Sequence, residues 1–231
     1  MKNARKIYVV IAAAGEGARL GGSKYKALVP VKKRAMLWWS LKVFSEVERI
    51  GKIVVVIPKN AKAGLFEKII KPFKAKNNID LVEGEAIRQL SVMNGIKALK
   101  CENEDIILVH DAARPLITVD LIERILEAMR CEDCAVPVVP LVDTVKEIRG
   151  EYVTGTLNRD LLRCVQTPQA FRYQCYKQAI AKYSLKEELY TDESVLFEKM
   201  GYKVKYVDGE RLNIKITYKE DLLIAESILC E

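Results

Sequence analysis

A glycine-rich stretch with several cations follows the first apolar run of the sequence. The run IYVVI ends at Ile11, and residues 12–26 read AAAGEGARLGGSKYK. Glycines let the backbone approach a phosphate and point N–H groups at its oxygens. Arginine adds a bidentate fork and lysine a point charge, so Arg19 and Lys26 are candidate phosphate ligands. A plain surface turn with solvated cations has the same composition.

Two familiar phosphate-binding patterns do not fit this stretch. The dinucleotide fingerprint G-x-G-x-x-G is met at Gly15 and Gly17 but has Leu20 at its third glycine. The region about 20 positions further on, VKKRAMLWWS, also lacks the acidic residue that would bind the ribose. The P-loop pattern needs a lysine after its second glycine, where this chain has Ser23. The sequence therefore predicts a phosphate loop of another kind, or a turn.

Short β-branched runs alternate with longer amphipathic stretches along most of the chain. The alternation predicts an α/β fold, with a Rossmann-like, mostly parallel twisted sheet and helices on both faces. Its carboxyl-end loops should hold the site. Predicted strands lie at 7–13, 52–58, 79–84, 105–112, 134–141 and 203–209, and predicted helices at 35–48, 63–73, 88–99, 118–130, 172–184, 191–201 and 219–230.

Residues 142–160 interrupt the alternation and read as two short strands joined by a turn at Arg149-Gly150. An isolated two-stranded hairpin is marginally stable, so we expect this protruding β-hairpin arm to pack on something, such as a second subunit. The sequence shows no internal repeat, low-complexity tract or linker. The simplest partition is a single domain, 1–231, that carries the arm at about 142–160.

Composition narrows the classes of protein that remain. Of 231 residues, 50% are hydrophobic and 30% charged, and no apolar stretch approaches the ~20 residues of a membrane span. We therefore expect no membrane partner and a cytoplasmic location. The six cysteines are too sparse for a disulfide scaffold. Cys131 and Cys134 form a C-x-x-C that suits a redox pair or half a zinc site, but ordinary thiols are the expectation.

The formal net charge of +7 is dispersed along the chain, with no basic run longer than KKR at 32–34. A nucleic-acid-binding protein would need a clustered basic stripe with interleaved aromatic residues. We therefore expect small phosphorylated substrates and no nucleic acid.

Motifs spread through the chain resemble those of one enzyme family. The opening stretch resembles the signature of sugar-phosphate nucleotidyltransferases. Later segments resemble, in order, the motifs of 2-C-methyl-D-erythritol 4-phosphate cytidylyltransferases of the non-mevalonate isoprenoid pathway. The resemblance covers about residues 7–225, and its segments are VEGEAIRQLSVMNGI (82–96), VHDAARP (109–115), DTVK (143–146), NRDLL (158–162), QTPQAF (166–171), TDES (191–194) and NIKIT (213–217).

The resemblance implies transfer of CMP from CTP to 2-C-methyl-D-erythritol 4-phosphate, with Mg²⁺ or another divalent cation and no covalent nucleophile. The products are 4-diphosphocytidyl-2-C-methyl-D-erythritol and pyrophosphate. Arg19 and Lys26 match the pair that stabilises the transition state, while Arg159 and Lys215 match residues that orient the methylerythritol phosphate. The family's arm reaches into the neighbouring subunit's site, which implies a homodimer. A ribitol-5-phosphate cytidylyltransferase, which shares the fold and the CTP loop, is the nearest alternative.

Further site residues are implied by the same resemblance. The CTP-binding residues are Ala13, Ala14, Gly15, Glu16, Gly17, Gly84, Glu85, Arg88, Ser91 and Ala112, the residues for the second substrate are Thr144, Arg159, Thr167 and Lys215, and the metal ligand is Asp111. Three alternatives stay open. Ser91 could be a first-turn helix residue, Asp111 a turn residue paired with Arg114, and His110 a structural histidine instead of a ligand or base.

The chain departs from the family's pattern at two places that affect the site. KYKAL stands where the family usually has PKQYL, so Lys24 is an alternative to Lys26 as the working lysine. Leu212 stands where some members carry an acidic residue, which leaves Asp111 as the only expected carboxylate for the metal.

Overall fold

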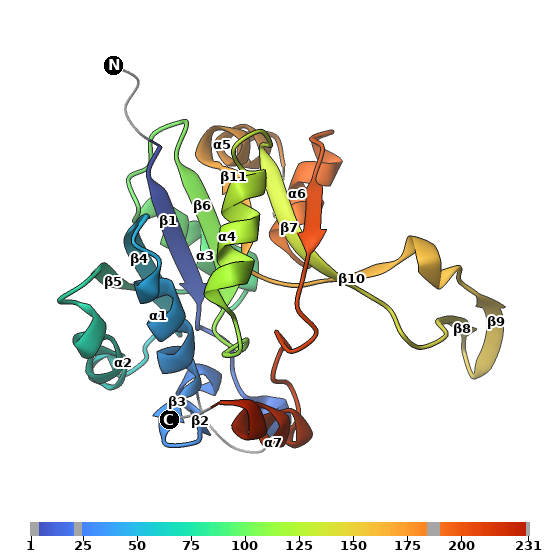
Figure 1. Ribbon diagram of the computed structural model, residues 1–231, viewed down its shortest axis with the longest axis horizontal. Helices are drawn as coiled ribbons and strands as arrows, with labels where there is room; N and C mark the ends of the chain where they lie inside the picture. The colour runs from blue at the N-terminus through green and yellow to red at the C-terminus, as the bar shows by residue number, and fades with distance from the viewer. Residues whose placement is uncertain (1–4, 21–24, 184–189, 230–231) are drawn as a thin grey trace.

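The protein is built around one eight-stranded sheet, seen in the computed structural model of Figure 1. The structure describes residues 5–20, 25–183 and 190–229. The strands of this sheet are β1 (Ile7–Ala12), β4 (Ile50–Ile57), β5 (Asn78–Glu83), β6 (Ile106–Asp111), β7 (Cys134–Pro140), β10 (Arg163–Val165), β11 (Gln169–Arg172) and β12 (Lys205–Asp208).

Most of these strands run in the same direction. The hydrogen-bonded order is β10-β7-β11-β6-β1-β4-β5, and β12 pairs with β7. β1 is parallel to β4 and to β6, β4 is parallel to β5, and β12 is parallel to β7. β10 and β11 run antiparallel to β7, and neither was predicted from the sequence. The predicted mostly parallel sheet is confirmed.

Helices cover both faces of the sheet, as predicted. One face carries α1 (Met36–Glu46), α2 (Ala63–Ile70) and α4 (Val119–Ala128), and the other carries α3 (Arg88–Lys97), α5 (Tyr173–Lys182) and α6 (Glu193–Lys199). Successive strand residues point to opposite faces. In β1, Val9 and Ile11 join the core under α1, α2 and α4, whereas Tyr8 and Val10 join the core under α3, α5 and α6. Burial on both faces explains why the central strands are almost entirely apolar.

Local signals in the sequence fix several helix ends. Thr118 caps α4, as predicted, because its Oγ1 accepts a hydrogen bond of 3.1 Å from the backbone N–H of Leu121. The predicted helix 63–73 divides instead into α2 and a 3-10 helix, Lys71–Phe73, with Pro72 in its first turn. Proline lacks the N–H that an α-helical turn would use at that point.

The arm is a separate two-stranded sheet of β8 (Lys146–Arg149) and β9 (Tyr152–Thr156), and it projects from the body in Figure 1. Its turn lies at Gly150 and Glu151, one residue later than predicted, since Gly150 takes the positive φ of +61° that favours glycine. The apolar side chains of Ile148, Tyr152 and Val153 are 62%, 76% and 60% exposed. In this chain alone the arm therefore lacks a cover for its apolar residues.

A third, smaller core joins the carboxyl-terminal part of the chain to the glycine-rich loop. It contains Ala225 of α7 (Lys219–Ile228) and Val31 of the short strand β2 (Pro30–Val31), which pairs with β3 (Arg34–Ala35). Leu20 and Ile216 also belong to it. The 3-10 helices Ala18–Leu20 and Lys26–Leu28 lie in the same part of the chain. None of the helices in the described ranges is both long enough and apolar enough to cross a membrane.

Close packing of α3 on the sheet predicts opposite effects of alanine at two helical glycines. A Cβ at Gly95 would lie 2.7 Å from a methyl carbon of Val10 and 2.7 Å from one of Val56. Because these short buried side chains cannot move aside freely, we expect Gly95→Ala to lower the free energy of unfolding by about 1–3 kcal/mol. Chemical denaturation of purified protein measures the change.

Gly64 of α2 is the matched control, because a Cβ there meets nothing within 4 Å. We expect Gly64→Ala to raise the free energy of unfolding by about 0.5–1 kcal/mol, since alanine restricts the unfolded chain. Equal effects of the two substitutions would contradict the packing described here.

Candidate active site

The candidate site lies where the direction of chain progression across the sheet reverses. From β1 the chain moves outward to β4 and β5, then returns to place β6 on the other side of β1. The parallel strands bring the residues after β1 and after β6 to the same edge, and Ala112 donates a backbone hydrogen bond of 3.1 Å to the carbonyl of Ala12. In open α/β sheets, ligands bind outside the carboxyl ends of the strands at such a switch point.

The glycine-rich loop is held at this edge by backbone hydrogen bonds. Ala13 donates to the carbonyl of Val56 at 2.9 Å, and Lys26 donates to the carbonyl of Gly15 at 3.2 Å. The second bond brings Lys26 back onto the loop that precedes Arg19. A Cβ at Gly15 would meet nothing within 4 Å, so this part of the loop faces open space. Lys24, the alternative working lysine, lies outside the described residues.

Three predicted cations converge beside the loop. Burial lowers the pKa of Lys26, and repulsion from Lys215 and Arg19 lowers it further. The Arg19 guanidinium carbon lies 5.8 Å from the ring centroid of Tyr218, a cation–π contact. This contact holds Arg19 beside the segment that contains Lys215. A lysine that two other cations repel at a strand edge suits a polyanionic ligand, which relieves the repulsion on binding.

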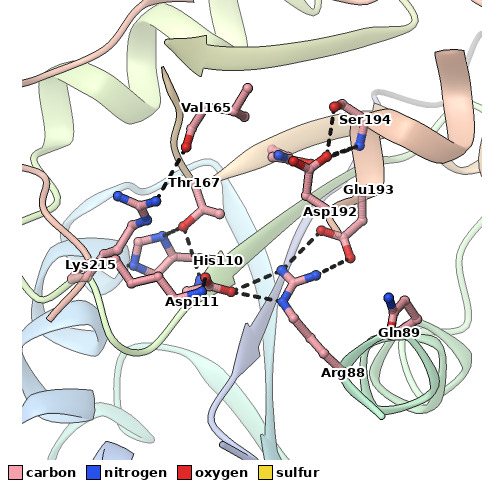
Figure 2. A network of polar contacts seen from close by, with 12 residues as sticks. Arg88, Gln89, His110, Asp111, Val165, Thr167, Asp192, Glu193, Ser194 and Lys215 are labelled. Atoms are coloured by element: carbon pink, nitrogen blue, oxygen red, sulfur yellow. Dashed lines mark hydrogen bonds and ion pairs between the residues drawn. The ribbon is translucent and has the colours of Figure 1, made fainter. Parts of the chain in front are cut away.

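Asp111 ends β6 in the middle of this group of cations. Its Oδ2 accepts a hydrogen bond of 2.6 Å from Lys215 Nζ, and its Oδ1 accepts bonds of 3.1 and 3.0 Å from Arg88 Nε and Nη2 (Figure 2). Burial alone would raise the pKa of Asp111, but Arg88 and Lys215 outweigh it and hold that pKa well below its ordinary range. Asp111 is therefore an ionised carboxylate fixed by two cations.

Arg88 connects Asp111 to a second carboxylate. On its other side it donates from Nη1 to Glu193 Oε1 at 2.8 Å and from Nη2 to Glu193 Oε2 at 3.2 Å. Glu193 is fully buried on α6. The sequence predicts Arg88 as a CTP-binding residue, but its guanidinium lies between two carboxylates in this structure. Glu193 received no role from the sequence, although the TDES motif that contains it was a signal.

His110 and Thr167 lie behind Asp111 in a hydrogen-bonded chain. His110 Nε2 is 3.2 Å from the carbonyl oxygen of Arg114, an acceptor, so Nε2 carries the proton. The neutral ring then accepts at Nδ1 from the Thr167 hydroxyl, 3.0 Å away, and that hydroxyl accepts from Asp111 N–H at 3.1 Å. Burial lowers the pKa of His110 to about 4. This histidine is structural, and the Thr167 hydroxyl points to it and to Asp111.

The segment 213–217 is joined to the loop after β6 by several bonds. Ile216 N–H donates to the carbonyl of Ala113 at 2.8 Å, and Arg114 Nη1 donates to the carbonyl of Asn213 at 2.7 Å. Arg114 also donates from Nη2 to the carbonyl of Val165 at 3.4 Å. The arginine thus binds backbone carbonyls, whereas Asp111 pairs with Arg88 and Lys215. These bonds place Lys215 beside Asp111.

Gly84 and Ser91 fix the loop after β5 against the glycine-rich loop. A Cβ at Gly84 would lie 2.7 Å from Ser91 Oγ and 3.0 Å from the Cβ of Ala14. Ser91 Oγ donates to the carbonyl of Glu85 at 2.9 Å and accepts from its N–H at 2.8 Å. Ser91 therefore acts as a first-turn helix residue that holds its own loop, which leaves one lone pair for a ligand. Glu85 forms a surface ion pair with Lys59 at 3.2 Å.

The two predicted residues of the arm lie away from this group within the chain. Thr144 and Arg159 are exposed on the segments that lead into and out of the β8–β9 hairpin. That hairpin projects to one side of the body in Figure 1. Arg159, at the start of a 3-10 helix (Arg159–Leu161), donates to the carbonyl of Val142 on the same arm. Among the described residues, no hydrogen bond or ion pair joins Arg159 to Lys215.

Asp111 offers the best-placed carboxylate for a metal ion. Across the described ranges, no group of three or more His, Cys, Asp or Glu residues is arranged to hold a metal. Mg²⁺ in nucleotide sites typically takes one or two carboxylates, substrate phosphates and water, so a single aspartate beside a polyphosphate site fits it. Cys131 is exposed and Cys134 is buried, and burial raises the pKa of the Cys134 thiol. That environment fits an ordinary buried thiol better than a redox pair.

Comparison with known proteins gives one consistent answer. The family model for 2-C-methyl-D-erythritol 4-phosphate cytidylyltransferase matches residues 7–231. The enzyme of that name from Bacillus velezensis is 38% identical over 96% of this chain and 94% of its own length. The one from Alkaliphilus oremlandii is 36% identical over 99% of this chain and 97% of its own length.

Solved structures agree with the sequence relatives. The crystal structure of a 4-diphosphocytidyl-2C-methyl-D-erythritol synthase from Anaerococcus prevotii superposes with a TM-score of 0.80 at 35% identity, covering 96% of this chain and 97% of that one. A 2-C-methyl-D-erythritol 4-phosphate cytidylyltransferase from Thermus thermophilus gives a TM-score of 0.78 at 32% identity, covering 96% and 98%. These matches, over nearly the whole chain, show that the chain belongs to the 2-C-methyl-D-erythritol 4-phosphate cytidylyltransferase family of nucleotidyltransferases.

Proposed function

We propose that this chain transfers CMP from CTP to 2-C-methyl-D-erythritol 4-phosphate in the non-mevalonate isoprenoid pathway. The products are 4-diphosphocytidyl-2-C-methyl-D-erythritol and pyrophosphate. Family membership over residues 7–231 supports the reaction. The observation that carries the proposal is the partly buried Lys26, which Lys215 and Arg19 repel, on a loop that faces open space.

The transfer is a substitution at the α-phosphorus of CTP. A phosphate oxygen of the second substrate forms a bond to that phosphorus while the bond to the β-phosphate bridging oxygen breaks, and pyrophosphate leaves. Negative charge grows on the α-phosphate oxygens and on the leaving group. Arg19 and Lys26 stabilise this charge, because fixed cations aimed at the transition state require no reorganisation. Lys215, held by Asp111, orients the incoming phosphate.

Base recognition belongs to the loop that contains Gly84 and Glu85. Backbone groups of this loop and the free lone pair of Ser91 face the cytosine and ribose. Residues 13–17 and Ala112 lie against the triphosphate, and the backbone N–H groups of residues 14–17 are its donors, since those of Ala13 and Ala112 already bond to carbonyls within the sheet. Arg88 contributes by holding Asp111 in place. Asp111 would hold Mg²⁺ together with substrate phosphates, and the ion would supply further charge neutralisation.

A homodimer completes the site in this proposal. The apolar residues of the arm are exposed. Arg159 bonds to Val142 on its own arm, while Lys215 bonds to Asp111 in the body. The arm of one subunit would bring Thr144 and Arg159 to the partner's methylerythritol phosphate, and Thr167 would line the same substrate through its backbone. The chain would act as one domain with its arm, and its five described cysteines, all free, suit the cytoplasm.

One assay tests the reaction directly. Purified protein with Mg²⁺ receives each of the four nucleoside triphosphates, paired with methylerythritol phosphate or with ribitol 5-phosphate, and pyrophosphate release is followed. We expect release only with CTP and methylerythritol phosphate. Release with ribitol 5-phosphate instead would assign the alternative substrate, and no release with CTP and either acceptor would reject the transferase.

Lys26 should be indispensable for turnover. We expect Lys26→Ala to lower kcat by at least ~100-fold, comparable to the loss of an oxyanion-hole donor. Steady-state pyrophosphate release measures it, with Lys24→Ala as the matched control because it removes a cation from the same stretch. A large loss in Lys24→Ala with near-normal kcat in Lys26→Ala would reverse the assignment.

Subunit mixing should reveal the shared site. Lys26→Ala and Arg159→Ala chains are each expected to be nearly inactive, the second through poor use of the methylerythritol phosphate. In a mixed dimer, one site combines an intact Lys26 with an intact arm from the other chain. Unfolding and refolding the two variants together should therefore restore about a quarter of the wild-type activity, since half of the dimers are mixed. Activity that stays at the level of the separate variants would show that the arm does not act across subunits.

A further inference from the structure

The TDES motif at 191–194 contains a buried carboxylate that the proposed reaction does not use. Glu193 is fully buried at the start of α6, and both of its oxygens accept hydrogen bonds from Arg88. Such bidentate pairing is typical of an ionised carboxylate with an arginine. An ionised group is costly to bury unless it is paired, so this pair requires an explanation beyond packing.

The geometry of Arg88 shows what Glu193 changes. A guanidinium has five N–H donors. Four donor–acceptor pairs join Arg88 to Asp111 and Glu193, two on each side. Although burial works against its charge, Glu193 and Asp111 raise the pKa of Arg88 above the ordinary arginine value. With both sides of its fork engaged, Arg88 cannot swing toward a triphosphate without abandoning one carboxylate (Figure 2).

Glu193 is the first residue of α6, and hydrogen bonds of its neighbours Asp192 and Ser194 fix that end of the helix. Asp192 caps α6 and accepts from the N–H of Ser194 at 2.9 Å, and that N–H also donates to Gln169 Oε1 on β11 at 3.0 Å. Gln89, next to Arg88 in sequence, donates to the carbonyl of Tyr190. Gln89 thus joins the start of α3 to the segment before α6, and Ser194 joins the start of α6 to β11.

The charges alternate along the chain of contacts from α6 to the site. Glu193 is negative, Arg88 positive, Asp111 negative and Lys215 positive. Without Glu193, Arg88 would pair with Asp111 alone. The Asp111 carboxylate would then attract Lys215 and a metal ion less strongly. Glu193 shares the attraction of Arg88, so Arg88 bonds to Oδ1 of Asp111 only and Oδ2 is left to Lys215.

We infer that Glu193 is a positioning residue for the reaction, which acts through Arg88 to set the orientation and effective charge of Asp111. It does not touch substrate. The inference rests on the proposed function for the identity of the substrates, but the linkage between Glu193, Arg88 and Asp111 does not depend on them. It assigns a role to a residue 105 positions away from Arg88 in the sequence.

The test begins with Glu193→Gln, which keeps the size of the side chain and removes its charge. We expect kcat to fall by about 10–100-fold and KM for CTP in Mg²⁺ to rise by about tenfold, the usual cost of removing a residue that supports a metal ligand. Calorimetry should show CTP binding unchanged in EDTA and weakened about tenfold in Mg²⁺, on the same scale. Loss of CTP affinity in EDTA together with kcat would mean that the site has simply collapsed, which would overturn the inference.

A matched control separates positioning from stability. Asp105 is also a buried carboxylate, but it lies at the opposite end of β6, where it accepts from the N–H groups of Lys6 and Glu102. Asp105→Asn should lower the thermal unfolding midpoint and leave kcat of the folded protein unchanged. If Glu193→Gln behaves in the same way, Glu193 is only structural. If wild-type protein fails to release pyrophosphate, the proposed function fails instead, and the metal dependence of CTP binding still decides the role of Glu193.

A second pair of variants keeps the test valid if Glu193→Gln does not fold. Arg88→Gln alone is compared with the double variant Arg88→Gln, Glu193→Gln, in which two neutral amides replace the ion pair. If Glu193 acts only through Arg88, the two proteins should agree in kcat within about twofold, because coupled residues are non-additive. A further loss of about tenfold or more in the double variant would show that Glu193 acts independently of Arg88.

Discussion

The Asp111 carboxylate is the constraint on which the rest of the site depends. It is 7% exposed at the end of a buried strand, so its charge has to be compensated inside the protein. The two cations that do so come from Arg88, 23 residues before it, and Lys215, 104 residues after it. Compensation of one carboxylate therefore holds together the start of α3, the end of β6 and the segment before α7.

Around Asp111 the protein combines a network of satisfied hydrogen bonds with a group of cations that repel Lys26. The side chains of Asp111, His110 and Thr167 all have hydrogen-bond partners, and these bonds fix the end of β6 at the site. Lys26, in contrast, is partly buried beside two other cations. Active sites commonly carry such local conflicts, because a group that is fully satisfied in the free protein has little to offer a ligand. A triphosphate resolves the conflict by supplying the missing negative charge.

The sequence predicted the repeating parts of the fold and missed the parts that depend on distant contacts. Apolar β-branched runs identified β1 and β4, and Thr118 marked the start of α4. β10 and β11 escaped because they are three and four residues long. β11 also begins with Gln169, which is buried because its amide oxygen accepts from Ser194. No periodicity in the chain predicts that bond. Within the site, residue types and motifs indicated Arg19, Lys26, Asp111 and Lys215, but the partnership of Arg88 with Glu193 required the folded structure.

A crystal structure of the protein with CTP and Mg²⁺ tests the central claim most directly. We expect the triphosphate against the backbone of residues 13–17, in contact with Arg19 and Lys26, while Arg88 keeps its bonds to both Asp111 and Glu193. A complex in which Arg88 leaves Glu193 to bind the phosphates, or in which the triphosphate lies away from Lys26, would contradict this account.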